Sequence, residues 1–128
     1  MKYGISKTID LSYDEAQARV TEELKKEGFG VLTTIDVKDT LKKKIDVDFA
    51  RYVILGACNP VFAHKALQAE TEIGLLLPCN VIVYETEDGK TGVSIMDPQA
   101  VLQLTDNAQI HEVAGEVRAK LERVLAAL

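Results

Sequence analysis

The chain has 128 residues, of which 47% are hydrophobic and 27% charged, with a formal net charge of −5 and a pI near 5.0. This length suits one folded domain that needs no metal or disulfide for stability, so we expect a single domain over residues 1–128. The acidic balance argues against nucleic acid and anionic membranes as partners, because both attract clustered lysine and arginine.

The first residues, MKYGISKTIDLS, contain no secretory signal pattern. No segment reaches the ~18 consecutive apolar residues that a membrane-spanning helix needs. We therefore expect a soluble, cytoplasmic protein with no membrane partner. Thiols in the cytoplasm are normally reduced, so we expect the two cysteines, Cys58 and Cys79, to be free rather than permanently bridged.

The first part of the chain is predicted to contain two strands separated by a helix. Residues 2–10 and 29–35 have the alternating or β-branched pattern of strands. Between them, Ser12-x-x-Glu15 has the pattern of a capping box, in which the two side chains satisfy the first free N–H groups of a helix. This helix is expected to end at Gly28, because glycine is favoured directly after the last helical turn.

The middle of the chain is predicted to contain a short helix, a buried strand and a further helix. Residues 36–48 have an amphipathic helical pattern with several lysines on its flanks. The continuous apolar run at residues 52–58 is typical of a buried central strand. Asn59 and Pro60 follow it, and these residue types are favoured as the N-cap and the first residue of a helix.

The last part is predicted to contain a β-hairpin and a long helix. Residues 80–86 and 91–97 flank the turn sequence EDGK and form the hairpin. Asp106-x-x-Gln109 then begins an amphipathic helix that continues nearly to Leu128. Because the chain combines single strands, helices and a hairpin, we predict an α+β fold in which helices cover one face of a mixed sheet.

Three motifs, GFGVLTTIDVKDTLKKK, ILGACNP and IGLLLPCNVIVYE, occur in this order over about residues 28–98. With these motifs the sequence closely resembles the domain of unknown function 302 family of uncharacterised bacterial and archaeal proteins. The resemblance implies a TATA-binding-protein-like α+β fold, with a curved, largely antiparallel sheet and helices packed on one side. It also implies a homodimer, and it implies no settled activity.

Cys58 is the strongest candidate for chemistry, since its thiol lies directly before the predicted start of a helix. The free N–H groups and the positive end of a helix dipole stabilise a thiolate, which is the reactive form of cysteine. Cys79 could act with it if the ends of the two strands meet. One hypothesis is therefore a thiol-dependent enzyme or redox protein that uses Cys58 with Cys79. The alternative is that both are core residues, since free cysteine is among the most often buried types.

Metal and nucleotide sites have little support in the sequence. Cys58, His64 and Cys79 would supply two sulfurs and one imidazole to a zinc ion, but no Cys-x-x-Cys or His-x-x-x-His spacing accompanies them. His111 stands alone near the start of the last helix. No glycine-rich phosphate-binding loop follows a strand. We therefore predict no metal and no cofactor.

A second group of residues is a candidate for ligand binding. Lys38 and Lys42 belong to a run of lysines that could hold the carboxylate or phosphate of a small anionic ligand, although such a run is more often a solvated helix face. Asn59 and Asn80 each follow one of the two cysteines. The favoured interpretation is a dimeric small-ligand-binding or interaction domain, with a pocket near the cysteine loops and the lysine helix.

Overall fold

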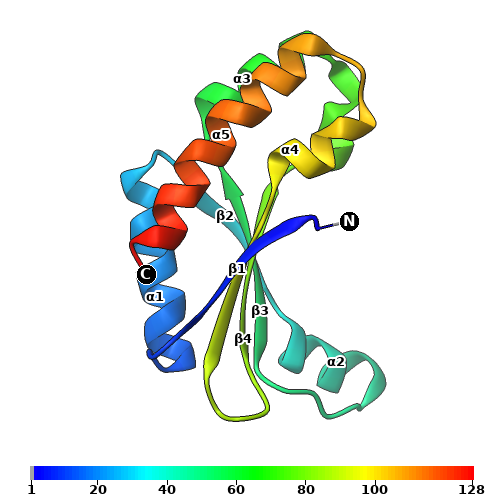
Figure 1. Cartoon of the computed structure of the whole chain (residues 1–128). Helices are drawn as coiled ribbons and strands as arrows, with labels where there is room; N and C mark the ends of the chain where they lie inside the picture. The colour runs from blue at the N-terminus through cyan, green and yellow to red at the C-terminus, as the bar shows by residue number, and fades with distance from the viewer. Residues whose placement is uncertain (1) are drawn as a thin grey trace.

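The computed structural model describes residues 2–128 and contains one antiparallel sheet, whose strand order is β1-β5-β4-β3-β2 (Figure 1). The strands are β1 (Gly4–Ile9), β2 (Gly30–Asp36), β3 (Tyr52–Cys58), β4 (Cys79–Glu85) and β5 (Thr91–Met96). The longer helices are α1 (Tyr13–Lys26), α2 (Val37–Ile45), α3 (Pro60–Ala69) and α5 (Ala108–Ala126). The shorter ones are α4 (Pro98–Val101) and the 3-10 helices η1 (Thr71–Leu76) and η2 (Leu102–Leu104).

These elements confirm the predicted α+β fold and the largely antiparallel sheet that the family resemblance implies. All four strand pairings are antiparallel, so the mixed sheet that we predicted from the order of the elements is wrong. The TATA-binding-protein-like curvature of the sheet stays a prediction. Among residues 2–128, no helix has both the length and the apolar character that crossing a bilayer requires.

Helix α1 begins and ends at the residues that its sequence signals indicate. The side-chain oxygen of Ser12 accepts a hydrogen bond from the backbone N–H of Glu15 at 3.2 Å, which confirms Ser12 as the N-cap. The Glu15 carboxylate accepts from the Ser12 hydroxyl at 2.9 Å, so the two side chains bond each other. Gly28 follows the helix with a φ of +86°, a conformation that costs glycine little. The backbone N–H of Phe29 then donates to the carbonyl of Leu24 at 2.9 Å and closes the last turn.

The long last helix begins one residue later than predicted. Asn107, not Asp106, is its N-cap, because the Asn107 side-chain oxygen accepts a hydrogen bond from the backbone N–H of Gln109 at 2.9 Å. Asp97 ends the hairpin as predicted and also caps the short helix α4, accepting from the N–H of Gln99. Sequence periodicity did not predict α4, η1 or η2, since elements this short contain too few turns to show a helical repeat.

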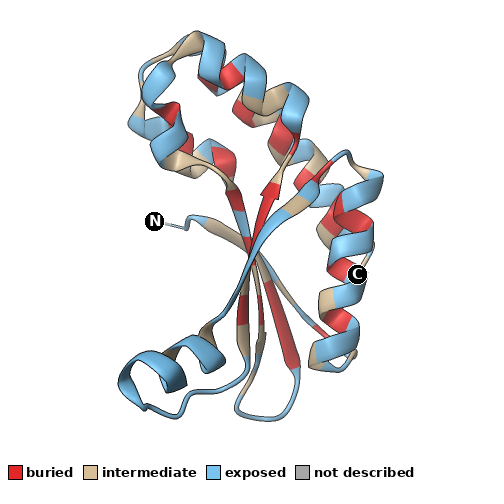
Figure 2. Ribbon diagram, turned by 180° about the vertical axis from the view of Figure 1, so that it is seen from behind, coloured by how far each residue is buried: buried red, intermediate tan, exposed pale blue. Residues whose placement is uncertain are grey.

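Helices α1 and α5 cover one face of the sheet and form the main core with it (Figures 1 and 2). The buried strand residues on this covered face include Val53, Leu55, Ala57, Val81, Val83, Val93 and Ile95. A second, smaller cluster lies beyond the end of the sheet, between α3, η1, η2 and α5. Its buried residues are Ala66, Ile73, Leu102, Ile110 and Ala114.

The opposite face of the sheet is left uncovered by α1 and α5, and we call it the open face. Helix α2 lies beside it, contacts β2 and β3, and has no buried residue of its own. Pairing across the strands assigns these positions to the open face: Gly4, Ser6, Thr8, Gly30, Thr33, Ile35, Tyr52, Ile54, Gly56, Cys58, Asn80, Ile82, Tyr84, Gly92, Ser94 and Met96. The rings of Tyr52 and Tyr84 stack on it with centroids 5.8 Å apart.

Candidate functional site: an apolar cavity at the end of the sheet

A cavity of about 370 Å³ lies where β3 ends and β4 begins, beneath the lobe formed by α3, η1 and α5. Its wall includes Phe29, Phe62, Ala66, Leu77, Leu102 and Val117. None of the described residues that line it is charged. The cavity therefore offers an apolar environment with very few polar side chains.

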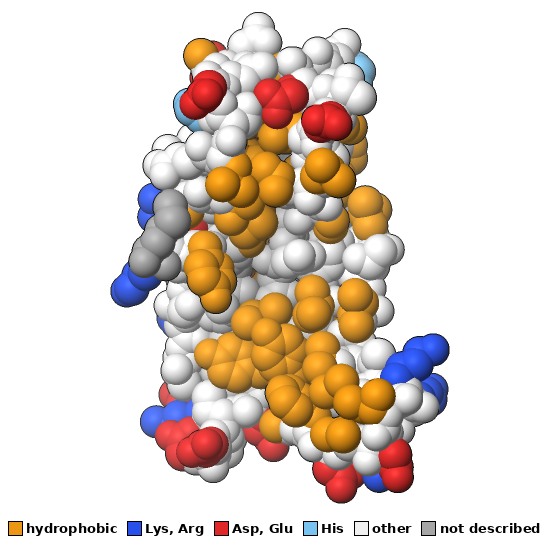
Figure 3. Space-filling model, turned by 90° about the vertical axis from the view of Figure 1, so that its right-hand side faces the viewer, with side chains coloured by type: hydrophobic (Ala, Val, Ile, Leu, Met, Phe, Trp, Pro, Cys, Tyr) orange, Lys and Arg blue, Asp and Glu red, His pale blue; other side chains and the backbone are white. Residues whose placement is uncertain are grey.

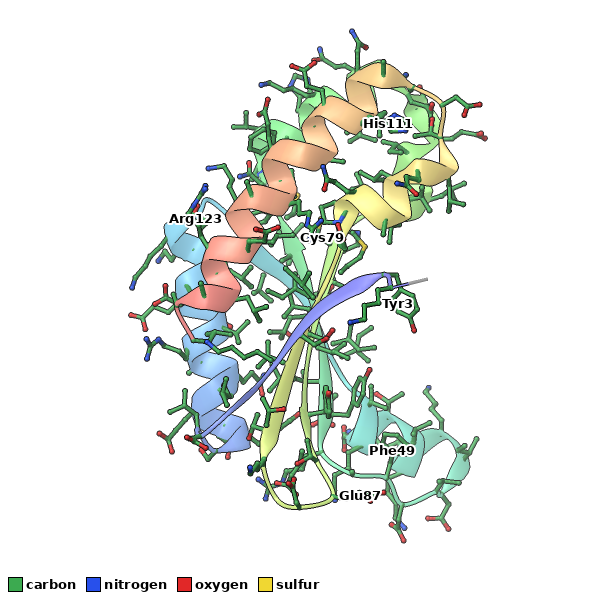
Figure 4. The ribbon with its side chains drawn as sticks, in the orientation of Figure 1. Tyr3, Phe49, Cys79, Glu87, His111 and Arg123 are labelled. Atoms are coloured by element: carbon green, nitrogen blue, oxygen red, sulfur yellow. The ribbon has the colours of Figure 1, made fainter. Side chains whose placement is uncertain are left out.

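Both cysteines line this cavity, so the structure brings the two predicted strand ends together. Cys79 is buried and lies opposite Ala57 of the neighbouring strand, and Cys58 is the next residue of that strand and is partly buried. Figure 4 shows Cys79 at the end of the sheet, beneath the helical lobe. Neither cysteine forms a disulfide.

The surroundings of the two thiols favour their protonated forms. Burial raises the pKa of Cys58 above its ordinary value. Burial, with a smaller contribution from the nearby Cys58 thiolate, raises the pKa of Cys79 to about 11. The start of α3 therefore does not produce the lowered thiol pKa that the thiol-enzyme hypothesis requires.

The raised pKa values of Cys58 and Cys79 predict slow alkylation of both thiols in the folded protein. With a pKa of about 11, about one Cys79 thiol in a thousand is ionised at pH 8. Iodoacetamide reacts with the thiolate, so it should modify Cys79 more slowly than Cys58 in the folded protein. After denaturation it should modify both cysteines quickly. Mass spectrometry of each site between pH 6 and pH 10 measures the rates. A Cys58 midpoint clearly below about 8.5 would contradict this expectation and favour a functional thiolate.

The two candidate asparagines have different positions. Asn59 lines the cavity, but its side chain is already used, because its oxygen accepts from the Phe62 N–H at 3.5 Å and its nitrogen donates to the Glu27 carbonyl at 3.4 Å. Asn59 therefore holds the start of α3 against the end of α1. Asn80 is exposed and lies opposite Gly56 on the open face, outside the cavity wall.

The lysines of α2 lie at the other end of the sheet. Strand β3 separates them from the cysteines, and Figure 4 shows Phe49, which follows α2, far from Cys79. The Lys42 ammonium is 3.0 Å from an Asp46 carboxylate oxygen and 3.2 Å from one of Asp48. The structure thus does not bring Lys38 or Lys42 to the cavity.

The two histidines take no part in the cavity. His64 is exposed on α3 and is not among the lining residues. The His111 ring nitrogen Nε2 donates to the Thr105 carbonyl at 2.7 Å, next to the start of α5. Within residues 2–128, no three histidine, cysteine, aspartate or glutamate side chains converge as a metal site would require. The zinc set of Cys58, His64 and Cys79 therefore has no geometric support.

Most of the cavity wall was missed by the sequence reasoning. Leu77 and Leu102 come from short segments without a recognisable period, and Val113 and Val117 were assigned only to the apolar face of a long helix. The apolar pattern of α3, which includes Phe62, was the one available signal. Periodicity shows that such residues face inward but not that they surround a space.

The fold and the cavity define a small α+β protein with an apolar site at one end of an antiparallel sheet. The family model "Domain of unknown function DUF302" matches residues 5–128, so the chain belongs to this family, as the sequence motifs predicted. The crystal structure of the uncharacterized conserved protein DUF302 from Bacillus stearothermophilus is similar, with a TM-score of 0.91, 29% sequence identity and 98% of each chain covered. No curated protein matches the sequence.

Proposed function

We propose that this chain is a single ligand-binding domain that works as a homodimer and holds a small, uncharged, largely apolar molecule in the cavity. The observation that carries the proposal is a cavity of about 370 Å³ whose wall is almost entirely apolar. Ligand sites in proteins typically measure about 300–1,000 Å³ and combine such walls with a few polar groups. The two free cysteines support a reducing compartment such as the cytoplasm.

The wall of the cavity selects against a charged ligand. Transfer of a charged group from water to an apolar site is costly unless an opposite charge or several hydrogen bonds compensate it. The polar side chains on the wall are Thr33, Cys58, Asn59 and Cys79, and none of them is charged at neutral pH when both thiol pKa values are raised. An anionic ligand held by Lys38 or Lys42 would need a different site.

The same observations favour ligand binding over thiol catalysis. A nucleophilic or redox cysteine needs an accessible thiolate, whereas burial raises the pKa of both thiols here. As part of an apolar wall, the two thiols act as small, polarisable contacts for a ligand. The cysteines then contribute to the shape of the site rather than to a reaction.

Two fluorescent probes with the same aromatic skeleton test the proposal. N-phenylnaphthylamine is uncharged, and anilinonaphthalene sulfonate adds one negative charge. We expect the uncharged probe to bind at least about tenfold more tightly, because the sulfonate would lose its hydration without gaining a partner. Fluorescence titration measures both affinities. Equal or tighter binding of the sulfonate would contradict an uncharged-ligand site.

A variant that fills the cavity locates the bound probe. Ala63 on α3 lines the cavity, so Ala63→Phe should place a ring in it and weaken N-phenylnaphthylamine binding at least about tenfold. Ala119→Phe adds the same ring at an exposed position of α5 and should leave the affinity unchanged. If both variants bind the probe as the wild type does, the cavity is not the site.

A further inference from the structure

We infer that the molecule held in the cavity carries an uncharged hydrogen-bonding head, an amide or a hydroxyl group, which Thr33 and Asn80 bind where the cavity opens onto the open face. This inference rests on the proposed function, because it names the class of ligand and the end of the ligand that faces solvent. A fatty primary amide or a fatty alcohol is the simplest member of this class.

The cavity extends around the end of the sheet to the open face. Its wall includes Ala57 and Cys79, which belong to the covered face. It also includes Thr33 and Cys58, which belong to the open face. Successive side chains of a strand face opposite sides of a sheet, so a wall made from both sides passes the end of the sheet. Because Thr33 is exposed, the cavity opens to solvent on the open face.

An irregularity in β2 shapes this opening. The pairing of β2 with β3 shifts register between Val31 and Thr33, so Leu32 is an extra residue without a partner on β3. In a regular strand only one of two successive side chains would face the cavity, but here both Leu32 and Thr33 line it. The side chain of Leu32 is also 68% exposed. The bulge thus places an apolar side chain and a hydroxyl group together at the opening.

Two polar side chains at this opening are free to bind a ligand. Thr33 on β2 and Asn80 on β4 both pair with Gly56 of β3, so the three residues form one row across the open face. The Thr33 hydroxyl leans over Gly56, since a Cβ at this glycine would overlap that oxygen. Neither the Thr33 hydroxyl nor the Asn80 amide has a hydrogen-bond partner within residues 2–128. Neighbouring strands lie about 4.8 Å apart, so a head group above Gly56 is within reach of both side chains.

The chemistry of this pair selects the head group. A hydroxyl and a side-chain amide each donate and accept hydrogen bonds, and an amide or hydroxyl head does the same. A carboxylate only accepts, and it would lose hydration without gaining an opposite charge, because no residue at the strand positions of the open face is charged. Figure 3 looks onto this face and shows a band of uncharged polar side chains and backbone between two groups of hydrophobic side chains, with charged side chains at the margins.

Decanamide and decanoate test the head group, because they share a ten-carbon chain and differ only in the head. Displacement of N-phenylnaphthylamine at pH 8, where decanoate is ionised, measures both affinities. We expect decanamide to bind at least about tenfold more tightly, since the carboxylate loses its hydration without a partner. Equal or tighter binding of decanoate would overturn the uncharged head.

Removing the two polar groups locates the head. Asn80→Leu and Thr33→Val each replace a polar side chain by an apolar one of similar shape, so each should weaken decanamide about fivefold. Both should leave the affinity for N-phenylnaphthylamine within about twofold, because this probe carries no amide or hydroxyl head. Thr34→Val is the matched control and should leave both affinities unchanged, since Thr34 is exposed on the same strand but does not line the cavity.

Each outcome separates the head group from the proposed function. Circular dichroism first shows which variants fold, and if only one folds, its decanamide affinity decides. The inferred head site is overturned, while the cavity stands, if N-phenylnaphthylamine binds but decanamide does not displace it. It is also overturned if the folded variants bind decanamide as the wild type does. If N-phenylnaphthylamine does not bind in the cavity, both the proposed function and this inference are wrong.

Discussion

Leu121→Ala is expected to lower the free energy of unfolding by about 3 kcal/mol, within the range of about 2–5 kcal/mol for buried leucines. Leu121 is fully buried on α5 and packs in the main core between this helix, α1 and the covered face of the sheet. Removing its three outer carbons takes away buried apolar surface and leaves a space that the neighbouring elements fill only in part. Urea denaturation at constant protein concentration measures the change.

The matched control lies on the same helix. Glu116 is exposed on α5 and makes no ion pair within residues 2–128, so Glu116→Ala should change the free energy of unfolding by less than about 0.5 kcal/mol. A Leu121→Ala variant as stable as this control would mean that α5 does not complete the core. The placement of the cavity beneath α5 would then also be wrong.

Gly56→Ala is expected to destabilise the protein by about 2 kcal/mol. Gly56 lies on the open face of β3, and a Cβ at this position would overlap the Thr33 hydroxyl on β2 and lie 3.0 Å from Pro78 Cγ. Both neighbours are stiff, because threonine is branched at Cβ and proline is a ring. The substitution therefore forces β2 and the start of β4 apart. Thermal and urea denaturation measure the loss.

A double-mutant cycle shows whether Thr33 is the cause. In a Thr33→Ala background the hydroxyl is absent, so Gly56→Ala should cost about 1 kcal/mol less than in the wild type. The contact with Pro78 Cγ at 3.0 Å and an ordinary contact with the Cβ of residue 33 at 3.5 Å remain. If the cost is the same in both backgrounds, the close packing of β2 on β3 is not the reason for glycine here. Thr33 and Pro78 also line the cavity, so the same packing shapes its edge.

Local signals were sufficient to predict most of the fold. The Ser12 N-cap, the Asn59-Pro60 helix start and the EDGK turn are short patterns that depend on a few neighbouring residues, and all three occur as predicted. The apolar run of β3 also predicted a central strand, since burial on one face and partial burial on the other leave little room for charge. The short helices carry no comparable pattern, and they were not predicted.

The site was predicted only in part. The sequence placed two cysteines at strand ends, and the structure brings both to one cavity. The sequence could not show that Lys38 and Lys42 lie at the opposite end of the sheet from the cavity. Their position depends on α2, which joins β2 and β3 at the end of the sheet far from the cysteines. For Cys58 the sequence left two alternatives, a thiolate with a lowered pKa at the helix start and a buried core thiol. Burial, which depends on tertiary packing, raises the thiol pKa and favours the second alternative.

Methyl NMR can show whether the cavity binds an uncharged apolar molecule. With alanine, isoleucine and valine methyl groups labelled, N-phenylnaphthylamine is added to the wild-type protein. We expect the largest chemical-shift changes at the methyl groups of Ala63, Ala66 and Val117, which line the cavity. Changes confined to Ile54 and Ile82 on the open face, or no changes at all, would contradict it.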